Sequence, residues 1–165
     1  MNRQEILSSL TLLPLSGALA SVSFPSNQSV LPEAEEWLPK KQVIGTSRNG
    51  AIISKCLRSG HMIFVAGIGG WYESDRPIPG DAKVQTRSAL AGMKESLEEG
   101  GSNMSNVLQV FVTVADPNKN LDLVNEAFLE FFPKDPPART FSSSKVTQMG
   151  RAGILVQIGC IAYVD

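Results

Sequence analysis

The feature that most constrains the fold of this chain is the stretch VLQVFVTVA at residues 107–115. Side chains alternate in character along it, which is the period of a β-strand whose two faces meet different surroundings. One face is expected to hold Leu108, Val110, Val112 and Val114, and the other Gln109, Phe111 and Thr113. Because Phe111 makes the second face partly apolar, that face also needs a cover, and self-association is the economical one.

Two helical patterns flank this strand. Apolar residues three or four positions apart begin after Asp81 and again after the turn at residues 116–118, which is the spacing of one helix face. Gly100-Gly101 ends the first pattern with residues that accept a left-handed C-cap, and Pro133 ends the second. The two stripes are Thr86, Leu90, Met93 and Leu97, then Leu121, Val124, Phe128 and Phe131.

Four further runs favour β-structure. Residues 51–57 and 62–66 are separated by a short polar segment, and this spacing predicts a hairpin. Residues 140–142 and 153–164 complete the series, the last run with strict alternation. The order strand, strand, helix, strand, helix, strand, strand predicts an α+β domain with helices packed on one face of a mixed sheet.

Composition limits the classes of function. With 165 residues, 42% of them hydrophobic, and a net charge of −1, the chain suits one globular domain that nothing draws electrostatically to nucleic acid or an anionic membrane.

Cys56 and Cys160 form no CxxC pair, and His61 is the single histidine, so no metal site or disulfide framework is expected. Both thiols are expected to be buried. The glycines of residues 67–70 lack the spacing of a phosphate loop, so no nucleotide cofactor is expected.

The first fifty residues differ from the rest. Residues 6–20 are an apolar stretch of signal-peptide length that ends in ALA, a sequence that permits cleavage. The single Arg3 and the interruption at Pro14 weaken the pattern, so export, an organellar transit segment and an uncleaved tail on a cytoplasmic protein all stay open. The expected organisation is a candidate signal segment at 1–20, a polar arm or linker at 21–50 and the folded domain at 51–165, with no integral membrane segment in the mature protein.

Five local patterns follow one another over residues 51–165. They are GHMIFVAG at residues 60–67, the helix with Gln85 and Leu90, the strand at 106–115, Val124-Asn125 before an aromatic helix end, and Pro137-Ala138-Arg139 before the closing strand. Each is loose alone, but their order and spacing together resemble the RidA/YjgF family of enamine/imine deaminases. The resemblance implies a chorismate-mutase-like fold, with two helices on one face of a mixed six-stranded sheet. It also implies a homotrimer whose sheets form a central barrel.

The same resemblance implies an activity and a site. Members of the family hydrolyse 2-aminoacrylate-like enamines and their imine tautomers to 2-oxoacids and ammonia, in clefts between subunits and without metal or organic cofactor. The family's carboxylate-binding arginine falls on Arg139, and a guanidinium suits that task because its fork donates to both carboxylate oxygens. Asn125 matches a cleft asparagine, and backbone groups around Gly67 and Phe141 fall where family members touch ligand or water. A small carboxylate, either a 2-oxoacid or an imine, is the expected ligand.

Three positions depart from the family's pattern. The acid of the last strand, which orients the hydrolytic water and manages its proton, falls on Gly159, and glycine does neither. A tyrosine of the first strand falls on Ile53, and a serine or threonine falls on Ala66. Glu73 and Asp75, on the loop after Trp71, are an alternative source of a base that reaches a cleft across an interface.

Two functions therefore stay open. In the first, the chain is a RidA-like hydrolase, impaired by Gly159 or acting on a bulkier imine, with Arg139 holding the substrate carboxylate. In the second, it is a non-catalytic trimeric binder of small carboxylates, or a scaffold for a partner protein. Export would favour the second, because it would separate the chain from the cytosolic PLP enzymes that make aminoacrylate.

Overall fold

The computed structural model describes residues 40–46, 50–70 and 80–165 of the chain. The candidate signal segment, most of the expected polar arm, and the loop acids Glu73 and Asp75 lie outside these ranges. Within them, no helix has both the length and the apolar character that a membrane span requires.

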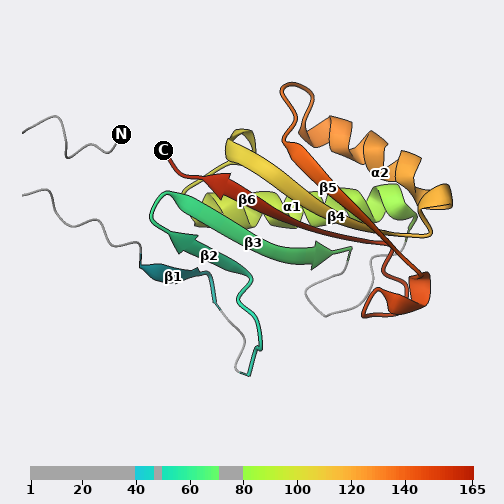
Figure 1. The fold of residues 1–165 in the computed structure, drawn as a ribbon, viewed down its shortest axis with the longest axis horizontal. Helices are drawn as coiled ribbons and strands as arrows, with labels where there is room; N and C mark the ends of the chain where they lie inside the picture. The colour runs from blue at the N-terminus through green and yellow to red at the C-terminus, as the bar shows by residue number, and fades with distance from the viewer. Residues whose placement is uncertain (1–39, 47–49, 71–79) are drawn as a thin grey trace, which may run out of the picture. The chain divides into compact units, whose positions relative to one another are not determined.

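The described residues form an α+β unit with six strands and two helices (Figure 1). The strands are β1 Lys41–Ile44, β2 Cys56–Ser59, β3 Met62–Gly69, β4 Val107–Ala115, β5 Ala138–Ser144 and β6 Val156–Tyr163, and the helices are α1 Ala82–Glu99 and α2 Pro117–Phe131. The sheet order is β1-β2-β3-β6-β4-β5. All neighbours are antiparallel except β4 and β5, which run parallel because α2 carries the chain back between them. The predicted fold class and the mixed six-stranded sheet are confirmed.

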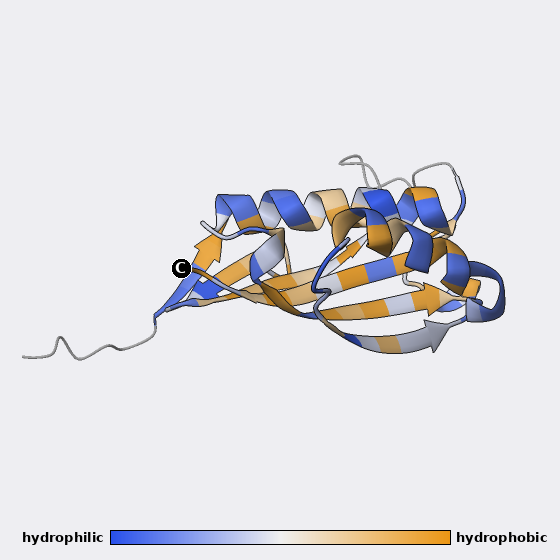
Figure 2. Cartoon of the chain, turned by 90° about the horizontal axis from the view of Figure 1, so that it is seen from above, coloured by the Kyte–Doolittle hydropathy of each residue, from blue (hydrophilic) through white to orange (hydrophobic). Residues whose placement is uncertain are grey.

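Both helices lie on the same face of the sheet, as predicted (Figure 2). α1 begins where the Asp81 carboxylate accepts a hydrogen bond from the Val84 N–H at 3.0 Å. It ends at Glu99 with Gly100 as its C-cap, and the next residue, Gly101, has a φ of +82°, a left-handed conformation that glycine adopts without strain. The predicted apolar stripe of α1 is confirmed, since all four of its residues are fully buried: Thr86, Leu90, Met93 and Leu97.

The core lies between the helices and the inner face of the sheet. On β6 every second residue is buried there, as its alternation predicted: Val156, Ile158, Cys160 and Ala162. On β4 the prediction is confirmed for Val110, Val112 and Val114. It is wrong for Leu108, which is 48% exposed, because a register shift between Val107 and Gln109 turns Val107 into the core instead.

The N-terminal part of the sheet differs from the sequence prediction. The strand expected at residues 51–57 begins only at Cys56, where pairing with both β1 and β3 starts. Ile53 therefore precedes the strand, and its side chain is exposed. The segment expected to be a polar arm contains β1, which has three exposed residues followed by one partly buried one and so shows no clear alternation.

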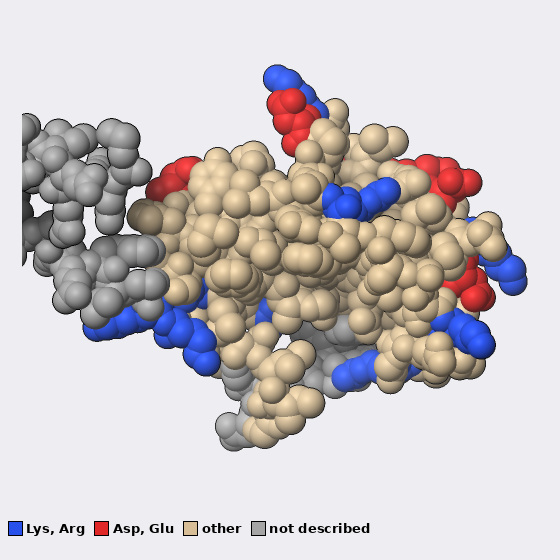
Figure 3. All heavy atoms as spheres, in the orientation of Figure 1, with Lys and Arg blue, Asp and Glu red and all other residues tan. Residues whose placement is uncertain are grey.

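The face of the sheet turned away from the helices is mostly uncharged, as Figure 3 shows for the view onto it. In the described part of the chain no helix covers this face (Figure 2). Its large apolar side chains are partly exposed: Phe64, Leu108, Phe111 and Tyr163. A broad apolar surface of this kind fits the predicted self-association, which stays a prediction.

Candidate functional site

β5 places Arg139 at the edge of the sheet and directs it toward the helices. β5 is the last strand in the sheet order, and Arg139 lies opposite Val110 in the parallel register with β4. Residues opposite one another in such a pair point to the same face of the sheet. Because Val110 is buried in the core on the helix side, Arg139 points to that side as well.

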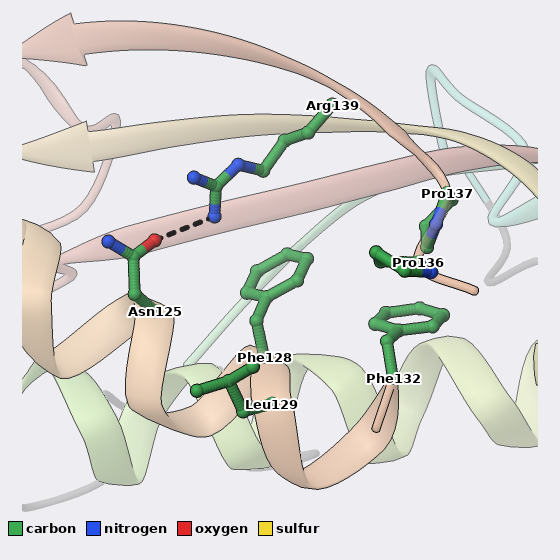
Figure 4. Close-up of a pocket in the computed structure, with 7 residues that line it drawn as sticks. All are labelled: Asn125, Phe128, Leu129, Phe132, Pro136, Pro137 and Arg139. Atoms are coloured by element: carbon green, nitrogen blue, oxygen red, sulfur yellow. Dashed lines mark hydrogen bonds between the residues drawn. The ribbon is translucent and has the colours of Figure 1, made fainter. Parts of the chain in front are cut away.

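Two residues of α2 hold the guanidinium of Arg139 (Figure 4). Its Nη1 donates a hydrogen bond to Oδ1 of Asn125 at 2.8 Å, and its central carbon lies 5.3 Å from the centroid of the Phe128 ring, within cation–π range. Asn125 and Phe128 share one side of α2 because they are three residues apart. Asn125 engages one of the five N–H donors of the guanidinium, so the group retains donors for a carboxylate.

An open hollow of about 340 Å³ lies beside the guanidinium, between α2 and the segment that leads into β5. It is lined by Asn125, Phe128, Leu129, Phe132, Pro136, Pro137 and Arg139. The rings of Phe128 and Phe132 stack with their centroids 5.8 Å apart, and both side chains are largely buried. One cation beside apolar walls is an arrangement that suits a small monocarboxylate.

Two of the carboxylates near Asn125 along α2, Glu126 and Glu130, form ion pairs with α1. Glu126 accepts a hydrogen bond from Lys83 of α1 at 2.6 Å, and Glu130 accepts one from Nε of Arg87 at 2.6 Å. The hydrogen bond from Arg87 holds the pKa of Glu130 below its ordinary value. Both acids are therefore held against α1, and neither is placed to act as a base beside Arg139.

The other residues predicted for the site do not all join Arg139 within one chain. Phe141 is exposed and lies two positions further along β5, on the same face as Arg139. Gly67 on β3 and Gly159 on β6 lie close together, but β4 separates β6 from β5, and Gly159 belongs to the sheet face away from the helices. Ile53 lies before β2, further still along the strand order. One chain thus presents two separate groups of candidate residues.

Gly159 packs against an irregular stretch of β3. The register between β3 and β6 shifts between Val65 and Ile68. A Cβ added at Gly159 would lie 2.9 Å from the carbonyl oxygen of Val65 and 3.4 Å from the nitrogen of Gly67. Both are backbone atoms, so a larger residue at this position requires the strand to move. The position that carries the acid in the family resemblance therefore has no room for a side chain here.

The two thiols are far from ionisation at neutral pH. Cys56 and Cys160 are buried in the core, as predicted, and both lie opposite Val65 across the sheet. Burial raises the pKa of both thiols, that of Cys160 to about 12. Because a thiol reacts as its thiolate, neither is suited to act as a nucleophile.

The sequence matches the family model described as Endoribonuclease L-PSP over residues 51–164, which is most of the chain. This chain belongs to the RidA/YjgF family. The RutC family protein of Pyrococcus abyssi is 32% identical over 129 residues, covering 76% of this chain and 98% of the relative. The RutC family protein of Pyrococcus horikoshii is 32% identical over 113 residues, covering 68% of this chain and 86% of the relative. The family predicted from the motifs is confirmed.

Solved structures share the RidA/YjgF fold. A member of the YjgF/YER057c/UK114 family from Mycobacterium tuberculosis superposes with a TM-score of 0.63 at 26% identity, over 76% of this chain and all of that one. Yeast Mmf1 superposes with a TM-score of 0.68 over the same shares of the two chains, at 19% identity, and so supports the fold alone.

The RidA/YjgF resemblance predicts Arg139 and Asn125 as site residues, and the structure adds an apolar wall beside them that the resemblance does not predict. Phe128 was expected to be a core residue, and it is largely buried, yet its ring also supports the guanidinium. A signal was available in the spacing of Asn125, Phe128, Leu129 and Phe132, which places the first three on one side of α2 and Phe132 at its C-cap on the same side. The spacing does not indicate which strand this side of α2 contacts.

Proposed function

We propose that this RidA/YjgF family member binds small 2-oxo and 2-imino carboxylates at Arg139 and hydrolyses reactive enamines and imines to 2-oxoacids and ammonia. The observation that carries the proposal is a guanidinium held by Asn125 and Phe128 beside an open hollow. The reaction is expected to be slow, because Gly159 supplies no acid.

The proposed chemistry needs a held carboxylate and a water molecule. The enamine takes a proton from water on carbon and returns one to water from nitrogen, and so becomes the imine. Water then adds to the carbon of the C=N bond, and one of its protons passes to the nitrogen to give a carbinolamine. This carbinolamine collapses to the 2-oxoacid as its hydroxyl proton passes to the departing ammonia. Arg139 contributes by fixing the substrate, which lowers the entropy cost of reaching the reactive geometry. The proton transfers fall to solvent, and loss of a general base typically costs about 10²–10⁴-fold in rate.

The proposal includes a homotrimer with clefts between subunits, as the family resemblance implies. Two observations support it. The sheet face away from the helices is apolar and partly exposed, and the candidate residues of one chain fall into two separate groups. A cleft that joins Arg139 of one copy to the region around Gly67 and Gly159 of another would bring both groups to one ligand.

A non-catalytic role is the second candidate, in which the trimer captures small carboxylates or serves as a scaffold without turnover. Gly159 is the observation that favours it. The carboxylate anchor is present, whereas backbone atoms of β3 occupy the space that a catalytic acid on β6 would enter.

A coupled assay tests the proposal. A serine or threonine dehydratase generates 2-aminoacrylate, and the release of 2-oxoacid is followed with and without the full-length chain. We expect a measurable acceleration that Arg139→Ala abolishes. In calorimetric titration with 2-oxobutanoate, Arg139→Ala should weaken affinity by about tenfold or more, since a hydrogen bond to a charged group contributes about 1.5–3 kcal/mol. Lys145→Ala, which removes an exposed cation just after β5, is the matched control.

The outcomes separate the two candidate functions. Acceleration and binding that both depend on Arg139 support the hydrolase. Binding that depends on Arg139 without acceleration of any amino-acid-derived imine favours the non-catalytic binder. Equal affinity in the parent chain and in Arg139→Ala would rule out Arg139 as the carboxylate anchor, and with it both the hydrolase and the carboxylate binder, and would leave the scaffold role.

A further inference from the structure

We infer that the hollow beside Arg139 selects carboxylates that carry an apolar side chain, branched aliphatic or aromatic, over the shortest 2-oxoacids. The inference rests on the proposed function of Arg139 as a carboxylate anchor and specifies the substrate class of the same site. It follows from the character of the walls, their arrangement around the guanidinium, and the exposure of one leucine.

The walls of the hollow are apolar apart from one end. Arg139 and Asn125 are its polar residues, and the remaining five are apolar: Phe128, Leu129, Phe132, Pro136 and Pro137. A volume of about 340 Å³ is more than a three-carbon acid fills. A short acid would therefore leave apolar wall in contact with water, whereas a longer apolar side chain would cover it.

The polar and apolar parts lie at opposite ends (Figure 4). The fork of Arg139 and the amide of Asn125 are at one end, Phe132 and the two prolines are at the other, and the ring of Phe128 lies between them. A ligand whose carboxylate pairs with the fork would extend its side chain along Phe128 toward Phe132. This layout matches a charged head followed by an apolar tail.

The side chain of Leu129 is a further apolar surface that the apolar side chain of a ligand could cover. It is 68% exposed although it lines the hollow. Complete burial of one methylene favours binding by about fourfold. Because the hollow is open to solvent, burial is partial and about twofold per carbon is expected, so three extra carbons should strengthen binding by about tenfold.

A second charge on the ligand should be disfavoured. Among the described residues that line the hollow, Arg139 is the one with a charged side chain. The distal carboxylate of a dicarboxylic 2-oxoacid would face Phe132 and the prolines without a partner, and an unpaired charge against apolar groups is costly. The hollow thus favours monocarboxylates with apolar tails over dicarboxylates of similar length.

Calorimetric titration of the full-length chain with four acids tests the inference. The acids are pyruvate, 4-methyl-2-oxopentanoate, phenylpyruvate and 2-oxoglutarate. We expect 4-methyl-2-oxopentanoate to bind about tenfold more tightly than pyruvate, phenylpyruvate at least as tightly as 4-methyl-2-oxopentanoate, and 2-oxoglutarate no more tightly than pyruvate. The amide of 4-methyl-2-oxopentanoate, which lacks the carboxylate, should bind much more weakly than its parent acid.

A matched pair of variants links the preference to the hollow. Leu129→Gln should lower the affinity ratio of 4-methyl-2-oxopentanoate to pyruvate by about two- to threefold. Val84→Gln changes another exposed apolar position on a helix and should leave that ratio as in the parent chain. Equal affinities across the series, each weakened by Arg139→Ala, would overturn the selectivity and leave the proposed function standing. If no acid binds, or if Arg139→Ala changes nothing, the proposed function fails and the inference fails with it.

Discussion

Gly159 lies where the backbone of β3 leaves no space for a Cβ, because that atom would meet the carbonyl oxygen of Val65 at 2.9 Å. We expect Gly159→Ala to lower the free energy of unfolding by about 1–3 kcal/mol, the usual cost of overpacking. Gly67→Ala is the matched control, since Gly67 adjoins the same irregular stretch but has no atom within 4 Å of its Cβ position. Urea denaturation of the two variants measures the difference, and equal losses would contradict this account of the packing.

The same contact changes how a restored acid should be interpreted. From the resemblance alone, Gly159→Glu is expected to raise the rate of imine hydrolysis. The glutamate enters only if β3 moves away from Val65 and Gly67, so the variant combines a possible gain in chemistry with a loss of packing. The rate of imine hydrolysis by Gly159→Glu can be interpreted only together with its free energy of unfolding, measured on the same preparation.

The buried thiols give a prediction that depends on pH. Burial raises the pKa of Cys160 from an ordinary 9.0 to about 12, and the pKa of Cys56 is raised as well. At pH 8 a disulfide reagent such as Ellman's should therefore modify the native protein far more slowly than the urea-unfolded protein. Because the native pKa of Cys160 exceeds the unfolded one, its contribution to stability is present below about pH 9 and is lost as the pH rises toward 12. Fast modification of both thiols in the native protein would contradict their placement.

Between elements, Gln85 ties α1 to the segment that enters β6. Its Nε2 donates to the Gly153 carbonyl at 2.8 Å, and its Oε1 accepts from the Leu155 N–H at 2.8 Å. We expect Gln85→Leu to lower the free energy of unfolding by about 2–4 kcal/mol, because both backbone groups lose a partner. Thr86→Val, the adjacent buried position, loses only a bond to the Ala82 carbonyl within the helix and should cost less than about 1 kcal/mol. A similar loss of stability for the two variants in thermal unfolding would show that the two hydrogen bonds of Gln85 contribute little to stability.

Elements whose burial follows a simple period were predictable from the sequence. The stripe that contains Leu90 and the alternation that contains Ile158 state directly which side chains meet the core. Leu108 was misplaced because a register shift breaks the period without a sequence signal. β1 was missed because a short edge strand with mostly exposed side chains has almost no pattern to read. Whether such a segment forms a strand depends on its hydrogen bonds to a neighbouring strand, here β2, and not on its composition.

The candidate site around Arg139 was also predictable only in part, because some of its contacts depend on tertiary packing. Arg139 could be proposed as a carboxylate anchor from its residue type and motif, since a guanidinium can donate to both oxygens of a carboxylate. Its contact with Phe128 depends on α2 packing over the edge of the sheet beside β5, which is a tertiary relation between distant segments. The same holds for Gly159, whose missing side chain is explained only by the position of Val65 on a neighbouring strand.

For the assembled protein, the uncovered sheet face is the surface whose disruption is most informative. Phe111 is 44% exposed, lies at the middle of β4 and is opposite Gly159 on that face. In the proposed trimer, Phe111→Lys would bury three unpaired ammonium groups, each at a cost of several kcal/mol. We therefore expect light scattering during size-exclusion chromatography to give a trimer mass for the parent chain and a monomer mass for Phe111→Lys.

Val84→Lys is the control, because it places the same charge at a comparably exposed position on α1, on the opposite side of the sheet, and should stay trimeric. A trimer that survives Phe111→Lys would place the interface on another surface, and Arg139 would then have to meet its ligand without the region around Gly67 and Gly159.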